Sequence, residues 1–337
     1  MSTTQNILEM GRTYDRPDYA KLAQAYKDGA TKFVADTVVP AFGVQTTKGK
    51  YRYQPEKTWF DRHDTSLPSP SGLPNEVDYT DAFANFDLYK IGLSKFFTAE
   101  ELAQPQVYGY TSSQQMIQEA VEFLSHKIRI DKECRIADFV NTTGNYASGF
   151  YGAPAVKWDT YATSDPLNDV MTYKAKLLGD ATIMVINDDV LRVLQMHPKV
   201  LAASTVQGSK RDATVNPYVT VEFLQNYFGI PQIVVAPGRV NSASDTLATN
   251  TLTKIWTDNV FIGHVNQAAA SSQMVGTFAK QLRLDLPQFR GAEGWVVREH
   301  ENARAGIFGG RHIDIGLWMQ PIVHAQKLGA LITDVLA

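Results

Sequence analysis

A proline-rich segment between two stretches of alternating polarity constrains the fold of this chain more than any other feature. KYRYQP (50–55) alternates charged and aromatic residues, and FDLYKIGLSKFFTAEEL (86–102) alternates again before a helix-capping signal at Thr98 and Glu101. Between them lies SLPSPSGLPNEVDYTDA, in which three prolines and a glycine indicate a loop. The sequence therefore predicts a two-stranded excursion over residues 46–110, with exposed strands and a proline-rich tip.

An excursion of this length needs support from outside itself. An isolated hairpin is marginally stable in water, and a long structureless loop inside a compact domain is uncommon unless it is functional. We therefore expect the excursion to lie against another copy of the chain. The candidates for structural or intersubunit contacts within it are Tyr51, Tyr53, Trp59 and Arg62.

Residues 111–140 are predicted to form one long helix. Three residues at its start can act as N-caps, and four apolar residues then recur at helical spacing: Thr111, Ser112 and Ser113, followed by Ile117, Val121, Leu124 and Ile128. On the other face, Arg129/Glu133 and Asp131/Arg135 are expected to form i,i+4 ion pairs. A helix of about 27 residues spans about 40 Å, so we expect a strut across the whole molecule.

The rest of the chain divides into an arm, a compact block and closing strands. Residues 1–45 are too few to fold alone and are expected to lie on another part of the structure. From about residue 155 to 300, helical and strand patterns alternate, which indicates a compact α/β block with a small-polar loop at 241–251. After this block, residues 312–317 alternate as a half-buried strand does, and residues 330–336 form a second apolar strand.

Composition excludes several classes of protein. The net charge of -3 provides no global field that would recruit nucleic acid. With Cys134 as its single cysteine, the chain can form no internal disulfide and no cysteine-rich zinc site. The polar N-terminus does not resemble a signal peptide, and no apolar run approaches the length of a membrane span.

No complete catalytic or cofactor-binding motif occurs in the sequence. Neither GxGxxG nor GxxxxGK[ST] follows a predicted strand, and GxSxG is absent. Asn187, Asp188 and Asp189 follow a predicted strand, where catalytic carboxylates often lie, but the same position suits a helix N-terminus and its dipole. We favour the capping role and expect neither a catalytic residue nor a cofactor.

The histidines and the remaining charged run also favour structural roles. None of the seven histidines forms an HExxH motif or another close metal-binding pair. His312 and Asp314 share a strand face and could bind a metal only with ligands from elsewhere, so no metal site is expected. REHENAR (298–304) is expected to be a solvated or intersubunit loop. Cys134, in the middle of the long helix, is expected to be a packed or half-buried thiol.

The segment KWDTYATSDPLNDVMTYKAKLLG (157–179) raises the choice between an acidic site and a helix start. Asp165 fits the N-cap position, Pro166 the first helical position, and Asp169 the first turns, where a negative charge favours the helix dipole. Trp158 precedes them in an irregular lead-in and is expected to be a packing anchor. All four residues are therefore structural candidates, at the junction where the chain enters the compact block.

The order of these parts resembles the major capsid proteins of tailed bacteriophages. The segments that carry the resemblance are WDTYATSDPLNDV, ATIMVI and NDDVLRVLQMHPKV, together with the arm, the proline-tipped hairpin and the strut helix. The resemblance implies an α+β, Hong Kong 97-like capsid fold with five parts. These are an N-terminal arm (1–45), an extended β-hairpin loop (46–110), a peripheral domain with a spine helix (111–154), an axial domain (155–305) and closing strands of both domains (306–337).

The resemblance also implies a function and a set of partners. Such chains assemble into pentamers and hexamers of an icosahedral shell around double-stranded DNA, which they contact non-specifically, and they bind no cofactor and catalyse no reaction. It implies assembly in the bacterial host cytoplasm, a location in the virion, a portal, a possible decoration protein and no membrane contact. Many relatives carry a longer N-terminal segment that serves as a scaffold, so we expect a separate scaffolding protein or a chain already trimmed.

Two alternatives remain. An encapsulin-like nanocompartment shell protein would share the fold, although encapsulins usually have a shorter extended loop. A cytoplasmic α/β enzyme is the weaker alternative, and Asp188 and Asp189 at the end of a strand are its best support.

Overall fold

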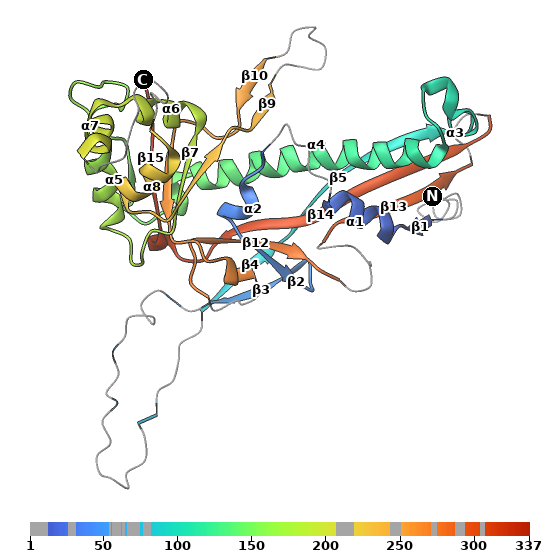
Figure 1. The fold of residues 1–337 in the computed structure, drawn as a ribbon. Helices are drawn as coiled ribbons and strands as arrows, with labels where there is room; N and C mark the ends of the chain where they lie inside the picture. Colours follow the sequence, from blue (N-terminus) through green and yellow to red (C-terminus); the bar gives the residue numbers. More distant parts are fainter. Residues whose placement is uncertain are drawn as a thin grey trace.

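The long helix α4 (Ser113–Asn141) joins an elongated part, made of sheet and helix, to a compact α/β block (Figure 1). The computed structural model describes residues 13–25, 32–53, 55, 62, 65, 75–76, 82–206, 219–242, 251–270, 275–286, 294–303 and 307–337. Helices and strands are mixed in both parts, which confirms the predicted α+β class.

The elongated part is built on a long sheet with strand order β1-β13-β14-β12-β2, in which β5 also pairs with β14. Its strands are β1 (Thr13–Asp15), β2 (Ala41–Val44), β5 (Tyr89–Thr98), β12 (Ala279–Leu284), β13 (Val296–Asn302) and β14 (Gly310–Val323). β14 is the central strand and runs antiparallel to β5, β12 and β13. Buried and half-buried residues alternate along it, which confirms the half-buried strand predicted at 312–317.

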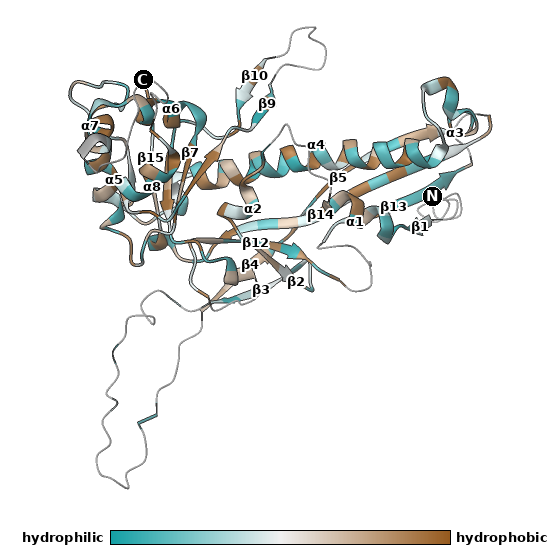
Figure 2. Cartoon of the chain, in the orientation of Figure 1, coloured by the Kyte–Doolittle hydropathy of each residue, from teal (hydrophilic) through white to brown (hydrophobic). Residues whose placement is uncertain are grey.

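α4 lies along this sheet and supplies much of its core. Ser112 is the N-cap, and its hydroxyl accepts a hydrogen bond from the Gln115 N–H at 3.3 Å. The whole predicted apolar stripe is buried: Ile117, Val121, Leu124 and Ile128. In Figure 2, hydrophobic and hydrophilic turns alternate along α4, as expected for a helix with one covered face. The predicted strut is confirmed.

The N-terminal arm packs on α4, as expected for a segment too short to fold alone. Its helices are α1 (Pro17–Ala25) and α2 (Ala35–Val38). Tyr19, Ala23 and Val38 are buried in the same core as the apolar face of α4. At the N-terminal end of α4 lies α3 (Ala99–Ala103) (Figure 1). The short 3-10 helix η2 (Pro105–Tyr108) connects α3 to α4. The capping box predicted at the start of α3 is confirmed.

The compact block contains a second sheet, with strand order β6-β15-β11-β7-β8. Its strands are β6 (Tyr151–Gly152), β7 (Ile183–Asn187), β8 (Gln232–Ala236), β11 (Val260–Gly263) and β15 (Gly329–Ile332). Its helices are α5 (Pro166–Lys174), α6 (Asp188–Met196), α7 (Pro198–Val206) and α8 (Val221–Phe228). The sequence pattern predicted α5, α6, α8, β7, β8 and β15, but it did not predict α7, β6 or β11. The strands enclose a separate buried cluster that includes Trp158, Met184 and Phe228.

The compact block ends earlier than the prediction of about residue 300, and that boundary is wrong. β12 and β13 pair with β14 in the long sheet and not with any strand of the compact block. The charged run 298–304 is likewise not a solvated loop as far as the structure describes it, because residues 298–302 form part of β13 between β1 and β14.

The extended hairpin is also shorter than predicted among the described residues. β3 (Lys48–Tyr53) pairs with β4 (Ala82–Asp87), whereas residues 89–98, assigned by pattern to the same hairpin, form β5 of the long sheet. Most of the proline-rich segment lies outside the described residues. A second small hairpin, β9 (Arg239–Asn241) with β10 (Leu252–Lys254), flanks the predicted polar loop, most of which is also outside them.

Candidate assembly surfaces

The base of the extended hairpin is fixed in a core of its own chain. Tyr51 is 1% exposed and packs with Phe86, Leu282 and Leu284 in a small cluster between β3, β4 and β12. Its hydroxyl lies 3.2 Å from Nδ1 of His324. The hairpin is therefore attached at its base to the long sheet of its own chain.

Lys280 and His324 place two basic groups in this base. The Lys280 Nζ lies 5.7 Å from the centre of the Tyr51 ring. Burial lowers the pKa of Lys280 to about 8. Burial, and secondarily the Lys280 charge, lowers the pKa of His324 to about 3. His324 is therefore neutral at physiological pH, and the core that holds the hairpin is sensitive to acid.

The structure corrects the expectation for the hairpin candidates. Tyr51 was expected on an exposed strand, but its side chain is buried within its own chain because it packs under the long sheet. Tyr53 is half-buried, with its ring 6.1 Å from the His324 ring. Arg62 is exposed, and Trp59 lies outside the described residues. Of the three candidates among the described residues, Arg62 is therefore exposed, Tyr53 is partly exposed and Tyr51 is buried.

A carboxylate in the middle of α4 joins three segments. Glu133 is 1% exposed, and its carboxylate accepts hydrogen bonds from the N–H groups of Val34 and Ala35 and from Nε1 of Trp256, at 2.7–3.2 Å. Burial raises the pKa of Glu133, and these hydrogen bonds oppose the shift. Glu133 therefore ties the arm, α4 and the compact block together.

The predicted ion pair between Arg129 and Glu133 is wrong. Arg129 instead donates to the carbonyls of Ala23 and Gln24 at the end of α1, and its guanidinium lies 5.3 Å from the centre of the Trp295 ring. The second predicted pair is confirmed, because Arg135 Nε donates to Asp131 at 2.7 Å. Spacing along the helix predicted both pairs. Arg129 and Glu133 do not pair because each of them contacts segments that are distant in the sequence.

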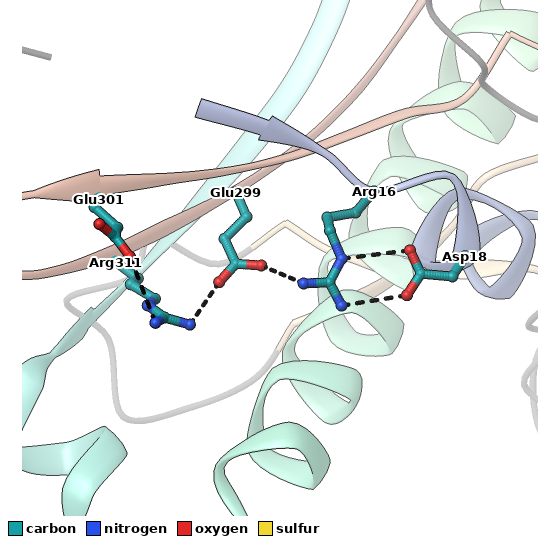
Figure 3. A network of polar contacts seen from close by, with 5 residues as sticks. All are labelled: Arg16, Asp18, Glu299, Glu301 and Arg311. Atoms are coloured by element: carbon teal, nitrogen blue, oxygen red, sulfur yellow. Dashed lines mark hydrogen bonds and ion pairs between the residues drawn. The ribbon is translucent and has the colours of Figure 1, made fainter. Parts of the chain in front are cut away.

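Charged residues fasten the start of the arm to the long sheet (Figure 3). Glu299 of β13 is 3% exposed and lies between two guanidinium groups, with Nη1 of Arg16 and Nη1 of Arg311 each at 2.8 Å. Arg16 also pairs with Asp18 in α1, and Arg311 with Glu301. The two arginines supply the charge that a buried carboxylate requires.

The junction residues lie where local rules placed them. Asp165 is the N-cap of α5 and accepts from the Asn168 N–H at 3.2 Å, with Pro166 at the first helical position. The hydrogen bond from Lys199, 2.9 Å away, lowers the pKa of Asp165. Trp158 is fully buried, and its Nε1 donates to Asp169 at 2.9 Å. This last bond was not predicted from the sequence. Burial raises the pKa of Asp169 despite it.

The carboxylates at the end of β7 also have structural partners. Asn187 is the N-cap of α6 and accepts from the Val190 N–H at 2.8 Å. Lys254 of β10 forms ion pairs with both Asp188 and Asp189. Burial acts to raise the pKa of Asp188, but the contacts with Lys254 outweigh it, so the pKa is lowered. This supports the capping interpretation over a catalytic pair.

The end of the molecule where α3 lies, farthest from the compact block (Figure 1), carries several exposed apolar side chains. Val107 and Tyr108 of η2 are 73% and 53% exposed, and Ile307 and Phe308, before β14, are 90% and 72% exposed. A cavity of about 460 Å³ lies beside Phe308 and is lined in part by Leu102, Ile117 and Arg311. Apolar groups exposed in this way are typical of surfaces that contact other proteins.

The whole chain was compared with known proteins. No protein-family model and no curated protein matches the sequence. Among solved structures, a phage-related protein from Bordetella bronchiseptica RB50 has a TM-score of 0.70 at 15% identity, covering 96% of this chain and 98% of that one. A protein assigned as the capsid protein of a prophage of E. coli CFT073 has a TM-score of 0.53 at 11% identity, covering 97% and 100%.

The chain has the same fold as these two phage proteins. The similarity extends over nearly the full length of both chains, so it includes the elongated part as well as the compact block. It confirms the resemblance drawn from the order of parts in the sequence. No helix among the described residues is both long and apolar enough to cross a membrane.

Proposed function

We propose that this protein is a structural major capsid protein, which assembles into pentamers and hexamers of an icosahedral shell around double-stranded DNA. The observation that carries the proposal is the fold shared over nearly the whole chain with a phage capsid protein. The small hairpin core and the exposed apolar end are consistent with a subunit that makes contacts at several places on its surface.

The five parts implied by the sequence resemblance fit this proposal with shifted boundaries. The elongated part, with α4 as its spine, would be the peripheral domain, and the block around β7 and β11 would be the axial domain. The hairpin of β3 and β4 would carry the extended loop over a neighbouring subunit. Because β12 and β13 belong to the long sheet, the peripheral domain would take strands from residues 279–302 as well.

The proposed partners follow from the same role. The chain would contact other copies of itself, packaged DNA non-specifically, a portal and a separate scaffolding protein, with a decoration protein as a further possible partner. It would be assembled in the bacterial cytoplasm and located in the virion. A net charge of -3 suits a shell that must not hold packaged DNA tightly.

The direct test is to express the full chain alone and to measure the mass of its assemblies by analytical ultracentrifugation and electron microscopy. Pentamers, hexamers, tubes or shells are expected. An enzyme would instead give a small closed oligomer, and a nanocompartment protein would give closed shells that carry a protein cargo and no DNA when produced in its native host. A strictly monomeric chain at high concentration would refute the proposal.

Removing the tip of the extended loop tests its role in assembly. Deletion of residues 62–80 should leave the folded chain intact, because the described base of the hairpin packs on its own core through Tyr51 and Phe86. Assembly into shells should fall strongly, as measured by the sedimenting fraction. The control replaces the same residues with a glycine-serine linker of equal length. Shell formation at the normal yield by the deletion variant would show that this loop is not the intersubunit clasp.

A further inference from the structure

The register of β13 and β14 brings three metal-ligating side chains together on one face of the long sheet. His300 lies directly opposite His312 in the antiparallel ladder, and Asp314 follows His312 on the same face two residues later. Their ligand atoms all lie within 4.8 Å of one another, and all three residues are half-buried. The sequence showed two of these ligands on one strand, and the fold supplies the third from the neighbouring strand.

We propose that His300, His312 and Asp314 bind a divalent transition-metal ion of the zinc type. Two imidazoles and a carboxylate form a ligand set suited to zinc, whereas calcium and magnesium favour oxygen ligands alone. In a tetrahedral zinc site with bonds of about 2.1 Å, the ligand atoms lie roughly 3.4 Å apart. Nδ1 of His300 is 3.4 Å from Oδ2 of Asp314, so this pair already has the required spacing.

The third ligand, His312, lies between two rings. The His312 ring lies between the rings of Phe96, with centroids 4.6 Å apart, and His300, at 5.1 Å. The Phe96 ring can occupy that position because residue 310 is glycine, since a Cβ there would come 2.5 Å from Cζ of Phe96. A rotation of the His312 side chain that moves its nitrogen by up to about 1.4 Å would complete a set of three ligands at zinc spacing.

The charges around the cluster favour a cation. The charged residues on the same face of β1, β13 and β14 are Asp15, Arg298 and Asp314, and the Arg298 Nε donates to Asp15 at 3.0 Å. With neutral imidazoles, these groups sum to one negative charge. The side chains of His300 and Asp314 are 28% and 42% exposed, so an ion can enter from solvent and its fourth position remains open to water.

Such an ion would clip β13 to β14 near the end of the long sheet that holds the arm. Binding requires the folded register, since His300 and Asp314 are brought together only by strand pairing, so the ion would stabilise the folded chain in proportion to its concentration. The site lies within one chain, and its existence does not depend on shell assembly.

The test is zinc binding to the purified, metal-free full chain by isothermal titration calorimetry, with magnesium as the competing hard cation. One zinc ion per chain is expected, undisturbed by millimolar magnesium, together with a rise in the melting temperature. His312→Gln and Asp314→Asn should each weaken binding at least about tenfold. The matched control, His264→Gln, removes a histidine outside the cluster and should bind as the parent does. Equal binding by all variants, or equal loss in the control, would overturn the proposal.

A chemical-footprinting experiment on the unaltered chain tests the same site without relying on the folding of any variant. Diethyl pyrocarbonate modifies accessible imidazoles, and the modified residues can be mapped by mass spectrometry on the unaltered chain. Zinc should protect His300 and His312 and leave the modification of His264 unchanged. Protection of neither cluster histidine at a zinc concentration that saturates the calorimetric signal would place the ion elsewhere and refute the site.

Discussion

The helix starts of the compact block and the buried carboxylate of α4 differ in how far apart in sequence their polar partners lie. In the compact block, Asp165, Asn187 and Thr220 each accept a hydrogen bond from the backbone N–H three residues later. In the elongated part, Glu133 reaches Val34 and Trp256, which are 99 and 123 residues away. These helix starts are therefore stabilised by local hydrogen bonds, whereas Glu133 joins segments that are distant in the sequence.

This difference predicts two kinds of response to substitution. Removing a local cap should cost a small amount of stability and leave the arrangement of segments unchanged. Removing a long-range partner should cost more and should loosen one segment from another, because several buried donors lose their acceptor together. For a proposed shell subunit the second kind matters more, since the arm, the hairpin and the sheet must keep their relative positions to meet neighbouring copies.

The largest effect is expected for Glu133→Ala. The N–H groups of Val34 and Ala35 and Nε1 of Trp256 would lose their acceptor, and each buried donor left without one costs about 1–3 kcal/mol. The free energy of unfolding, measured by chemical denaturation of the unassembled chain, should fall by about 4 kcal/mol. Hydrogen exchange should also become faster in α2, which the carboxylate holds against α4.

The matched control is Glu119→Ala, which makes the same change at an exposed position of the same helix. It should change stability by no more than about 0.5 kcal/mol. Equal losses in the two variants would mean that helix propensity, and not the buried hydrogen bonds of Glu133, accounts for the result.

A smaller effect is expected from acid at the base of the hairpin. The pKa of His324 is lowered from 6.5 to about 3, so the folded chain resists a proton that the unfolded chain accepts. The resulting stability is present above pH 6.5 and is lost as the pH falls towards 3. Between pH 7 and pH 5 the loss should be about 2 kcal/mol, since each unit of pKa corresponds to about 1.4 kcal/mol.

The variant His324→Phe isolates this contribution from other acid-titrating groups. Its unfolding free energy should depend less steeply on pH between 7 and 5, by about the same 2 kcal/mol. Tyr51→Phe removes the hydroxyl beside His324 but keeps the histidine, so it should retain the original pH dependence. Parallel pH profiles for His324→Phe and the parent chain would contradict the assignment.

Local patterns in the sequence were sufficient for much of the fold. Periodicity and capping residues located α4 to within two residues at each end, and they identified the start of α5 at Asp165. The end of α8 at Gly229 is equally local, because its φ of 60° is a conformation that glycine adopts at little cost. These features depend on residues within a few positions of one another, which is why one sequence can reveal them.

Features that depend on long-range pairing could not be found in this way. The pattern around Arg129 and Glu133 is that of an exposed ion pair, and nothing nearby in the sequence indicates that Val34 and Trp256 compete for the carboxylate. The burial of Tyr51 depends likewise on β12 and His324. The meeting of His300 with His312 requires the register of β13 on β14, which the sequence does not specify.

The smallest effect is expected in the compact block, for Asp165→Ala. Loss of an N-cap costs about 1 kcal/mol, and the exposed ion pair with Lys199 adds little to it. Asp165→Asn keeps the cap acceptor and removes the charge, so denaturation should show it to be nearly as stable as the parent. An equal loss in both variants would assign the stability to Lys199 instead. A loss of about 4 kcal/mol, as expected for Glu133→Ala, would show that Asp165 does more than satisfy one local donor, and the distinction between local caps and long-range partners would fail.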